Sequence, residues 1–137
     1  PLGLRTTAGA TDTVVRTILA VDEANQTLTF AGDVPQESVV QLMRANFDRL
    51  VEGAAQASHA ADQEATGNSL SIAISCVGRR LVLGERVDDE VEAIFDAVPE
   101  GSKLIGFYSY GEISPHSPGR CGVLHNQTMT MTRLWET

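Results

Sequence analysis

The segment Ser69–Tyr110 constrains this chain most, because it has the pattern of a strand, a helix and a second strand. Ser69–Cys76 alternates apolar residues with small ones, which predicts a strand with one apolar face and one face suited to a closely packed helix or ligand. Val77–Val98 repeats apolar residues at helical spacing, and Gly84 within it marks a break or a close contact. Lys103–Tyr110 favours a strand, and if the two strands are parallel in one sheet their crossover is right-handed.

The flanking segments add further strands and a second long helix. Thr13–Val21 and Thr27–Phe30 predict a hairpin, and Gln36–Asp62 carries an apolar stripe typical of a helix. Cys121–His125 and Thr128–Trp135 predict two final strands joined by a tight hairpin. The expected order is β-β-α-β-α-β-β-β. We therefore expect an α/β (α+β) fold in which two long helices pack on one mixed, largely antiparallel sheet.

Length and charge limit the class of protein. The 137 residues suit one domain, here 13–137, with 1–12 as a leader or the cut edge of a longer chain. A net charge of −8 disfavours nucleic acid and anionic membranes, which attract basic surfaces. No apolar run reaches the roughly 18 residues of a membrane-spanning helix, no secretory signal opens the chain, and the cysteines form no CxxC pair. We expect a cytoplasmic protein with reduced thiols.

The first candidate site is the junction between strand and helix at Cys76–Arg80. A helix N-terminus has unpaired N–H groups and a partial positive charge, which favour a thiolate at Cys76 and bind anions. Arg79 and Arg80 offer a bidentate grip on a carboxylate or a phosphate. The alternative interpretation is a buried structural cysteine followed by two solvated arginines.

The second candidate site is the aromatic stretch Gly106–Ile113. Its glycines let the backbone approach a ligand or take a positive φ, and Tyr108 and Tyr110 each offer a ring and a hydroxyl. Glu112 follows at the end of the predicted strand, where α/β sheets commonly place ligands. The stretch lacks the Lys-Ser/Thr pair of a P-loop, so nucleotide binding there is rejected. The alternative is an aromatic core strand with glycine bends.

The third candidate site is the polar run Leu124–Thr128. His125 is a residue that titrates near neutral pH or ligates a metal, whereas Asn126 also suits a turn with a positive φ. The other two histidines, His59 on a predicted helix and His116 in a proline-rich loop, are expected at the surface.

Taken together, these motifs resemble the C-terminal half of the FIST sensory domain. The resemblance is carried by ISCVGRRLVLGERVDDEVEAI, IGFYSYGEISP and LHNQTMTMT in that order, with FAGDVPQ upstream. It extends from about Val14 to about Leu134. The positions of this sequence that match are Cys76, Gly78, Arg79, Gly84, Gly111, Glu112, His125 and Asn126.

The resemblance implies an intracellular sensor of a small ligand, an amino acid or a similar anionic metabolite. Such domains accompany signalling outputs such as histidine kinases, chemotaxis receptors and cyclic-di-GMP enzymes, and the N-terminal FIST half, absent here, is expected as a partner. In this hypothesis the chain is not an enzyme and needs no cofactor. The expected ligand-binding residues are Cys76, Gly78, Arg79, Tyr108, Tyr110, Gly111, Glu112, His125 and Asn126.

Three alternatives stay open. The chain is a haem or nitric oxide sensor with His125 or Cys76 as ligand, although no CxxCH motif is present. It is a thiol enzyme with Cys76 as nucleophile and His125 as base, although no nucleophile signature is present. Or it is a structural half-domain that forms a homodimer through the alanine-rich end of the first predicted helix.

Overall fold

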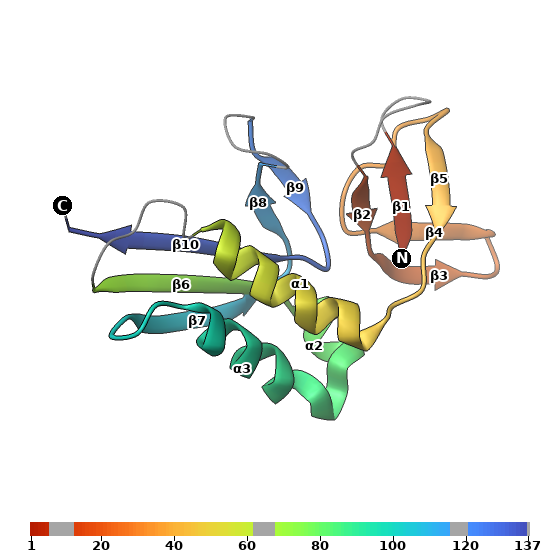
Figure 1. Ribbon diagram of the computed structural model, residues 1–137. Coiled ribbons are helices and arrows are strands. Elements are labelled where there is room, and N and C mark those ends of the chain that lie inside the picture. The colour runs from red at the N-terminus through yellow and green to blue at the C-terminus, as the bar shows by residue number, and fades with distance from the viewer. Residues whose placement is uncertain (6–12, 62–67, 116–120, 137) are drawn as a thin grey trace.

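The computed structural model describes residues 1–5, 13–61, 68–115 and 121–136. Figure 1 shows two parts that lie side by side. The N-terminal part contains strands β1 to β5, and the larger part contains the three α-helices with β6, β7, β10 and a short hairpin of β8 and β9.

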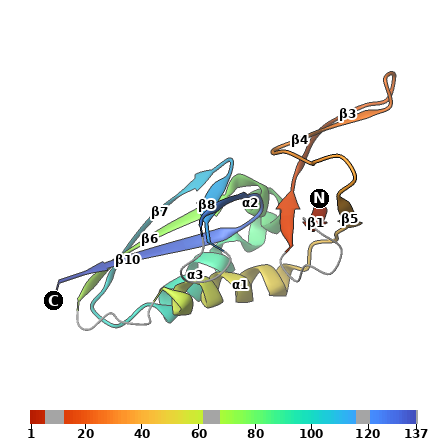
Figure 2. The same cartoon turned by 90° about the horizontal axis from the view of Figure 1, so that it is seen from above.

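The larger part is built on β6 (Ser69–Cys76), which lies between β10 (Met129–Trp135) and β7 (Lys103–Ser109). β6 and β7 are parallel, which the sequence leaves open, and β10 is antiparallel to β6. Helices α1 (Phe47–Ala60) and α3 (Val87–Ala97) cover the same face of this sheet (Figure 2). That face carries the small side chains of β6, of which the buried ones are Ser69, Ser71 and Ser75. The predicted packing of a helix on this face is therefore confirmed.

The connection from β6 to β7 is helical but is not one helix. α2 (Val77–Leu83) follows β6 directly and leads through a 3-10 turn, η1 (Gly84–Arg86), into α3. Gly84 has a φ of 57°, which residues with a side chain rarely adopt. The predicted helix Val77–Val98 is confirmed in its extent, and Gly84 is a break rather than a point of close contact, since nothing lies within 4 Å of a Cβ built there.

The other predicted helix, Gln36–Asp62, is wrong in its N-terminal part. Val39–Leu42 instead form strand β5, which pairs antiparallel with β1 (Leu2–Arg5). α1 begins only after Asn46, whose side-chain Oδ1 accepts a hydrogen bond from the backbone N of Arg49 at 3.0 Å. A short apolar run fits either a helix or a strand, and pairing with a distant strand decides between them.

The N-terminal part contains more of the chain than the predicted domain. Although the domain is expected to begin after residues 1–12, β1 is already the middle strand of a sheet, between β5 and β2 (Val14–Arg16). The predicted strand Thr13–Val21 is divided into β2 and β3 (Ile18–Asp22). β3 pairs with β4 (Thr27–Phe30), which confirms the first predicted hairpin, and this hairpin projects from the molecule (Figure 2).

The last predicted hairpin is wrong. β9 (Val123–His125) pairs with β8 (Glu112–Ser114), a strand that was not predicted, while β10 pairs with β6. The chain turns between β9 and β10 at Gln127, which has a φ of 56°. Within the described ranges the strands form two three-stranded and two two-stranded sheets rather than one, but the mixed, largely antiparallel α+β class is confirmed.

Candidate functional site

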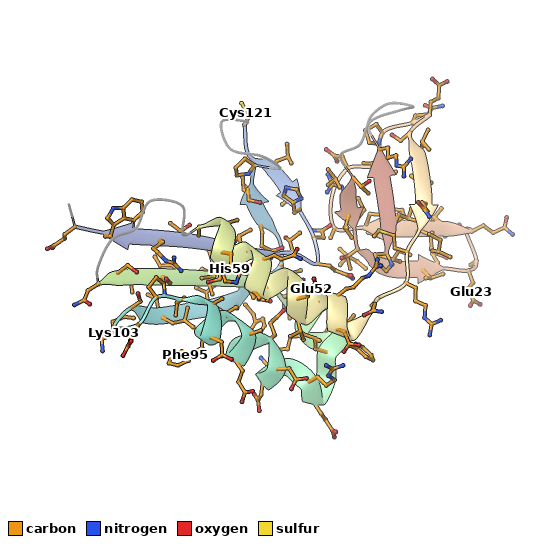
Figure 3. The ribbon with its side chains drawn as sticks, in the orientation of Figure 1. Glu23, Glu52, His59, Phe95, Lys103 and Cys121 are labelled. Atoms are coloured by element: carbon orange, nitrogen blue, oxygen red, sulfur yellow. The ribbon has the colours of Figure 1, made fainter. Side chains whose placement is uncertain are left out.

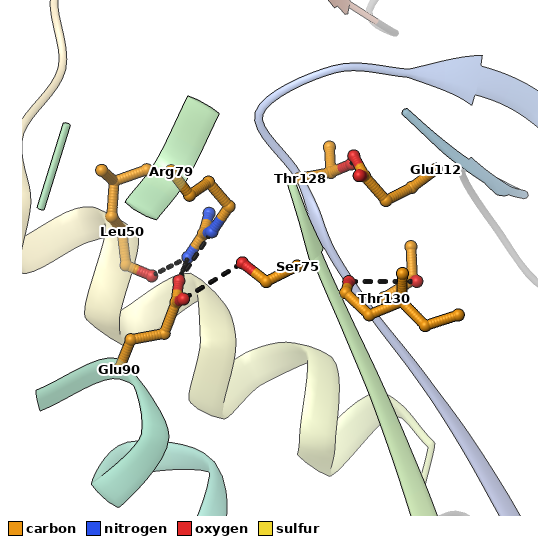
Figure 4. Close-up of polar contacts among 8 residues, drawn as sticks. Leu50, Ser75, Arg79, Glu90, Glu112, Thr128 and Thr130 are labelled. Atoms are coloured by element: carbon orange, nitrogen blue, oxygen red, sulfur yellow. Dashed lines mark hydrogen bonds and ion pairs between the residues drawn. The ribbon is translucent and has the colours of Figure 1, made fainter. Parts of the chain in front are cut away.

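A buried ion pair joins four elements of the larger part (Figure 4). Arg79 on α2 contacts Glu90 on α3, with Nη2 and Nε lying 2.6 and 2.7 Å from the carboxylate Oε1. The Ser75 hydroxyl on β6 donates to Oε2 at 3.1 Å, and Arg79 Nη2 also donates to the Leu50 carbonyl oxygen on α1 at 2.6 Å. The arginine is 5% exposed and the glutamate 1%, so each charge depends on its partner in place of water.

This pair places the two adjacent arginines in different environments. Arg79 lies inside the protein rather than at an open helix end, with two of its nitrogens bonded to protein acceptors. Arg80 is exposed, and its guanidinium carbon lies 5.1 Å from the centroid of the Tyr108 ring, in cation–π contact. Arg80 is therefore the arginine that faces solvent near the ion pair.

A cavity of about 300 Å³ lies beside the ion pair, between α3 and β7. The side chains are small or missing where β6 and β7 face α3, at Ala73 and Gly106, and this leaves the space. Most of the lining is apolar, with polar groups contributed by Ser75, Glu90 and Tyr108. The apolar residues that complete it are Val91, Leu104, Ile105, Phe107 and Met129. A mostly apolar cavity with a few polar groups is the usual form of a small-molecule site.

Tyr108 lines the cavity, and its pKa is shifted there. Burial raises the pKa of its phenol above the ordinary value, and the negative charges of Glu90 and Asp88 act in the same direction. The nearby cations Arg80 and Arg79 offset part of this effect. The phenol is therefore a neutral hydrogen-bond donor throughout the physiological pH range.

A second polar cluster surrounds Glu112, where the β8–β9 hairpin meets the sheet. Glu112 is 3% exposed, and its Oε1 and Oε2 accept hydrogen bonds from the hydroxyls of Ser109 at 2.5 Å and Thr128 at 2.7 Å. Its cross-strand neighbour is His125, whose Nε2 donates to the Ser114 carbonyl oxygen at 3.0 Å. The carboxylate is thus satisfied by uncharged donors inside the protein.

Asn126 joins this cluster to the N-terminal part. Its Nδ2 donates to the His125 carbonyl oxygen at 3.1 Å, and its Oδ1 accepts from the backbone N of Thr17 at 3.3 Å. Nearby, Arg16 Nη1 donates to the Leu124 carbonyl oxygen at 3.0 Å. Because Asn126 is 1% exposed, its amide holds the two parts together rather than facing solvent.

The predicted site residues fall into two groups and one outlier. Those near the end of β6 and the β8–β9 hairpin are Cys76, Gly78, Gly111, Glu112, His125 and Asn126. Arg79 and Tyr108 belong to the ion pair and its cavity, whereas Tyr110 is 84% exposed and lies apart. Of the histidines expected at the surface, His59 is exposed on α1 (Figure 3), and His116 lies outside the described residues.

Of the three polar residues of the cavity, Tyr108 was a predicted site residue, whereas Glu90 and Ser75 were not. The signal for Glu90 is its spacing of three and four residues from Val87 and Ile94, which places a charged residue in the apolar stripe of the helix. A charged residue that is buried in this way requires a buried partner. Ser75 lies on the face of β6 that the sequence predicts to carry only small side chains. Its role in the site depends on the hydrogen bond to the Glu90 carboxylate, which the sequence does not show.

The haem alternative is not supported by the positions of its ligands. Cys76 and His125 are 3% and 5% exposed, neither lines the cavity between α3 and β7, and the histidine Nε2 is already bonded to a carbonyl oxygen. Within the described part of the chain, no three His, Cys, Asp or Glu side chains gather as a metal-binding group. These residues do not fit haem ligation.

The comparison with protein families decides what kind of domain this is. The family model described as the FIST C domain matches residues 1–115. The chain belongs to the FIST C domain family. FIST C domains are sensory domains typical of signal transduction proteins, and FIST domains pair an N-terminal with a C-terminal half.

Other comparisons add nothing to this assignment. No curated protein and no solved structure matches the FIST C chain. None of the helices described in the structure is long and apolar enough to cross a membrane.

Proposed function

We propose that this FIST C domain senses a small ligand for a signal transduction protein, and that an amino acid binds in the cavity between α3 and β7. The observation that carries the proposal is the composition of that cavity, which is mostly apolar and has Ser75, Glu90 and Tyr108 as its polar groups. This combination suits a ligand with one apolar part and one charged end.

The charges around the cavity favour a zwitterion over a simple anion. Glu90 lines the cavity with its charge balanced by Arg79, whereas Asp88 is exposed and close enough to raise the Tyr108 pKa, so Asp88 attracts an ammonium group and repels a carboxylate. Arg80, on the solvent side of the Tyr108 ring, supplies the opposite charge for a carboxylate. The apolar side chain of the amino acid then packs against Val91 and its apolar neighbours in the cavity.

The domain acts by binding rather than by catalysis in this proposal. The thiol enzyme that the sequence allows needs an accessible nucleophile, whereas Cys76 is 3% exposed. The base assigned to that enzyme, His125, has its Nε2 bonded to the Ser114 carbonyl oxygen. These two observations support a non-enzymatic role.

The partners proposed for this domain are the N-terminal FIST half and a signalling output protein such as a histidine kinase, in the cytoplasm. The acidic balance of the chain, with a net charge of −8, supports a partner other than nucleic acid or an anionic membrane. The exposed apolar residues of β3, β4 and β5 in the N-terminal part supply a surface for the N-terminal half, and they are Leu19, Val21, Leu28, Val39, Val40 and Leu42.

Calorimetric titration with the common amino acids tests the proposed ligand and its site. We expect one or a few apolar amino acids to bind, and Val91→Trp, which fills the cavity, to weaken binding at least tenfold while the melting temperature stays within a few degrees. The matched control is Val21→Trp on the projecting hairpin, which should bind as the wild type does. Unchanged affinity in Val91→Trp would place the ligand elsewhere.

A further inference from the structure

β7 is an edge strand whose outer side is open. Among the described residues β7 pairs only with β6, so the backbone groups on its other edge have no partner strand there. Figure 1 shows β7 at this edge of the sheet, next to α3. Edge strands are commonly protected by a charge, a proline or a bulge. Leu104–Tyr108 contains neither a charge nor a proline, and its register with β6 runs without a bulge, so the edge is free to accept another strand.

The cavity between α3 and β7 reaches this open edge. Side chains of a strand alternate between its two faces, so a cavity on one face alone would be lined by every second residue. Leu104, Gly106 and Tyr108 face the helices, in register with the small residues of β6. Ile105 and Phe107 point the other way, yet all five residues line the cavity. The cavity therefore follows the backbone of β7 for roughly 16 Å, which is longer than a single amino acid.

Helix α3 forms the other wall of a groove along this edge. Val91 lines the cavity and is 47% exposed, and Phe95, one helical turn further on, is 63% exposed. On the face of β7 that points away from α3, Ile105 and Phe107 are exposed as well. A chain that lies along the edge of β7 therefore meets apolar groups with both of its faces. This arrangement suits an extended peptide that adds a strand to the sheet.

The charge of the groove indicates what kind of chain it accepts. Asp88, Glu92 and Asp96 follow one another at intervals of four residues on α3, and all are exposed. Besides burial and Glu90, the charge of Asp88 raises the pKa of the Tyr108 phenol, which places Asp88 near the end of β7. In the described parts of the chain none of the three exposed carboxylates forms an ion pair. A second copy paired edge to edge would bring two such helices together, whereas a basic segment neutralises them.

We propose that the open edge of β7 binds an extended, basic segment of a partner protein, which adds to the β10-β6-β7 sheet as a fourth strand. One apolar side chain of the segment enters the cavity between Val91 and Gly106, where β7 has no side chain. Basic side chains on the same face of the segment lie against the carboxylates of α3. The alternate side chains pack beside Ile105 and Phe107. Backbone hydrogen bonds supply affinity, and the cavity and the charges select the sequence.

Calorimetric titration with capped peptides tests the charge and the backbone pairing. The probe is acetyl-Lys-Val-Leu-Val-Lys-amide, which as a strand has the leucine and both lysines on one face and the valines on the other. We expect it to bind, and the same peptide with glutamate in place of both lysines to bind at least tenfold more weakly. Two further peptides are N-methylated at one or the other set of alternate residues. Only one set faces β7, so one of these two peptides should bind at least tenfold more weakly than the other.

A substitution in α3 tests the wall of the groove without changing the cavity. Phe95→Lys removes an apolar group beside the groove and repels the lysines of the probe (Figure 3), so it should weaken peptide binding at least tenfold. The matched control is Leu19→Lys on the projecting hairpin, because Leu19 is 61% exposed, close to the 63% of Phe95. The control should bind the peptide as the wild type does. Circular dichroism of both variants shows whether they are folded.

Four results overturn the proposal. The first is a wild-type chain that does not bind the capped probe even at millimolar concentration. The second is equal affinity for the two N-methylated peptides, since binding then does not depend on strand pairing. The third is equal affinity of Phe95→Lys and Leu19→Lys for the probe. The fourth is a wild-type dimer in sedimentation velocity that Phe95→Lys dissociates, since a second copy then occupies the edge.

The amino-acid proposal fails separately from this one. The peptide and the proposed amino acid share one cavity, but strand addition rests on the open edge of β7. A chain that binds the probe but no amino acid overturns only the amino-acid proposal, whereas a chain that binds an amino acid but not the probe overturns only strand addition. Phe95→Lys should leave amino-acid binding unchanged, because Phe95 does not line the cavity.

Discussion

Arg79 and Glu90 are two residues on which the packing of α1, α2, α3 and β6 depends. Their charges are buried together with the Ser75 hydroxyl and the Leu50 carbonyl oxygen. We expect Arg79→Ala to lower the free energy of unfolding by about 3–5 kcal/mol, because it leaves the carboxylate buried without a cation. Chemical denaturation at neutral pH measures this loss.

The control for Arg79→Ala is the same substitution at an arginine on the surface. Arg49 is exposed on α1, so Arg49→Ala should change the free energy of unfolding by no more than about 0.5 kcal/mol. The paired change Arg79→Met with Glu90→Leu should recover much of the lost stability, since it removes both buried charges. Equal losses from Arg79→Ala and Arg49→Ala would contradict the assignment of a buried ion pair.

Tyr108 gives the protein a specific pH dependence. Its folded-state pKa is raised above the unfolded value of about 10, first by burial and then by Glu90, so the unfolded chain loses this proton first. The contribution of Tyr108 to stability is complete below pH ~10 and is lost as the pH rises through the folded-state pKa. Denaturation measured from neutral to alkaline pH should show this loss, and Tyr108→Phe should show less of it.

Spectroscopy separates the two tyrosines of the chain. In Tyr110→Phe only Tyr108 ionises, and its absorbance change near 295 nm should have a midpoint above pH ~10. A midpoint at or below that value would show that the Tyr108 phenol is not buried beside Glu90.

At the scale of elements, β6 and β7 approach closely at a single glycine. A Cβ built on Gly106 lies 2.5 Å from the Ala73 carbonyl oxygen, an atom of the backbone that cannot turn aside. We expect Gly106→Ala to lower the free energy of unfolding by about 1–3 kcal/mol through overpacking. Gly53→Ala on α1 is the control, because nothing lies within 4 Å of its Cβ, and it should stabilise the protein by roughly 0.5–1 kcal/mol. Chemical denaturation of both variants checks the pair.

Elements were predictable where the pattern was local. The strand Ser69–Cys76 and the break at Gly84 follow from alternation and from a glycine inside a helical repeat. β5 was mistaken for helix because Val39–Leu42 lies among residues at helical spacing and its strand partner, β1, is more than 30 residues away in sequence. β8 was missed because Glu112–Ser114 is too short to show a period. Its pairing partner is β9, which lies on the other side of residues 116–120.

At the scale of the molecule, few polar contacts between described residues join the N-terminal part to the rest. Arg16 donates to the Leu124 carbonyl oxygen, and the Thr17 backbone N donates to the Asn126 side chain. We expect Arg16→Ala to increase amide hydrogen exchange in β1 to β5 severalfold while exchange in β6 is unchanged, because opening of the N-terminal part leaves the larger sheet intact. Mass spectrometry of exchange resolves the two parts. Equal increases in both would show that they unfold as one unit.

The sequence by itself determined the α+β class, the strand–helix–strand unit of Ser69–Tyr110, the small-residue face of β6, and the resemblance to the FIST family that the family comparison then showed. These features depend on short-range periodicity and on the order of motifs along the chain, both of which are visible in the sequence alone. Only the tertiary structure showed that Arg79 is paired with Glu90, that Asn126 bonds to Thr17, and that a cavity lies under α3. Each of these depends on which distant segments meet, and a periodic pattern records which face of an element is buried but not what lies against that face.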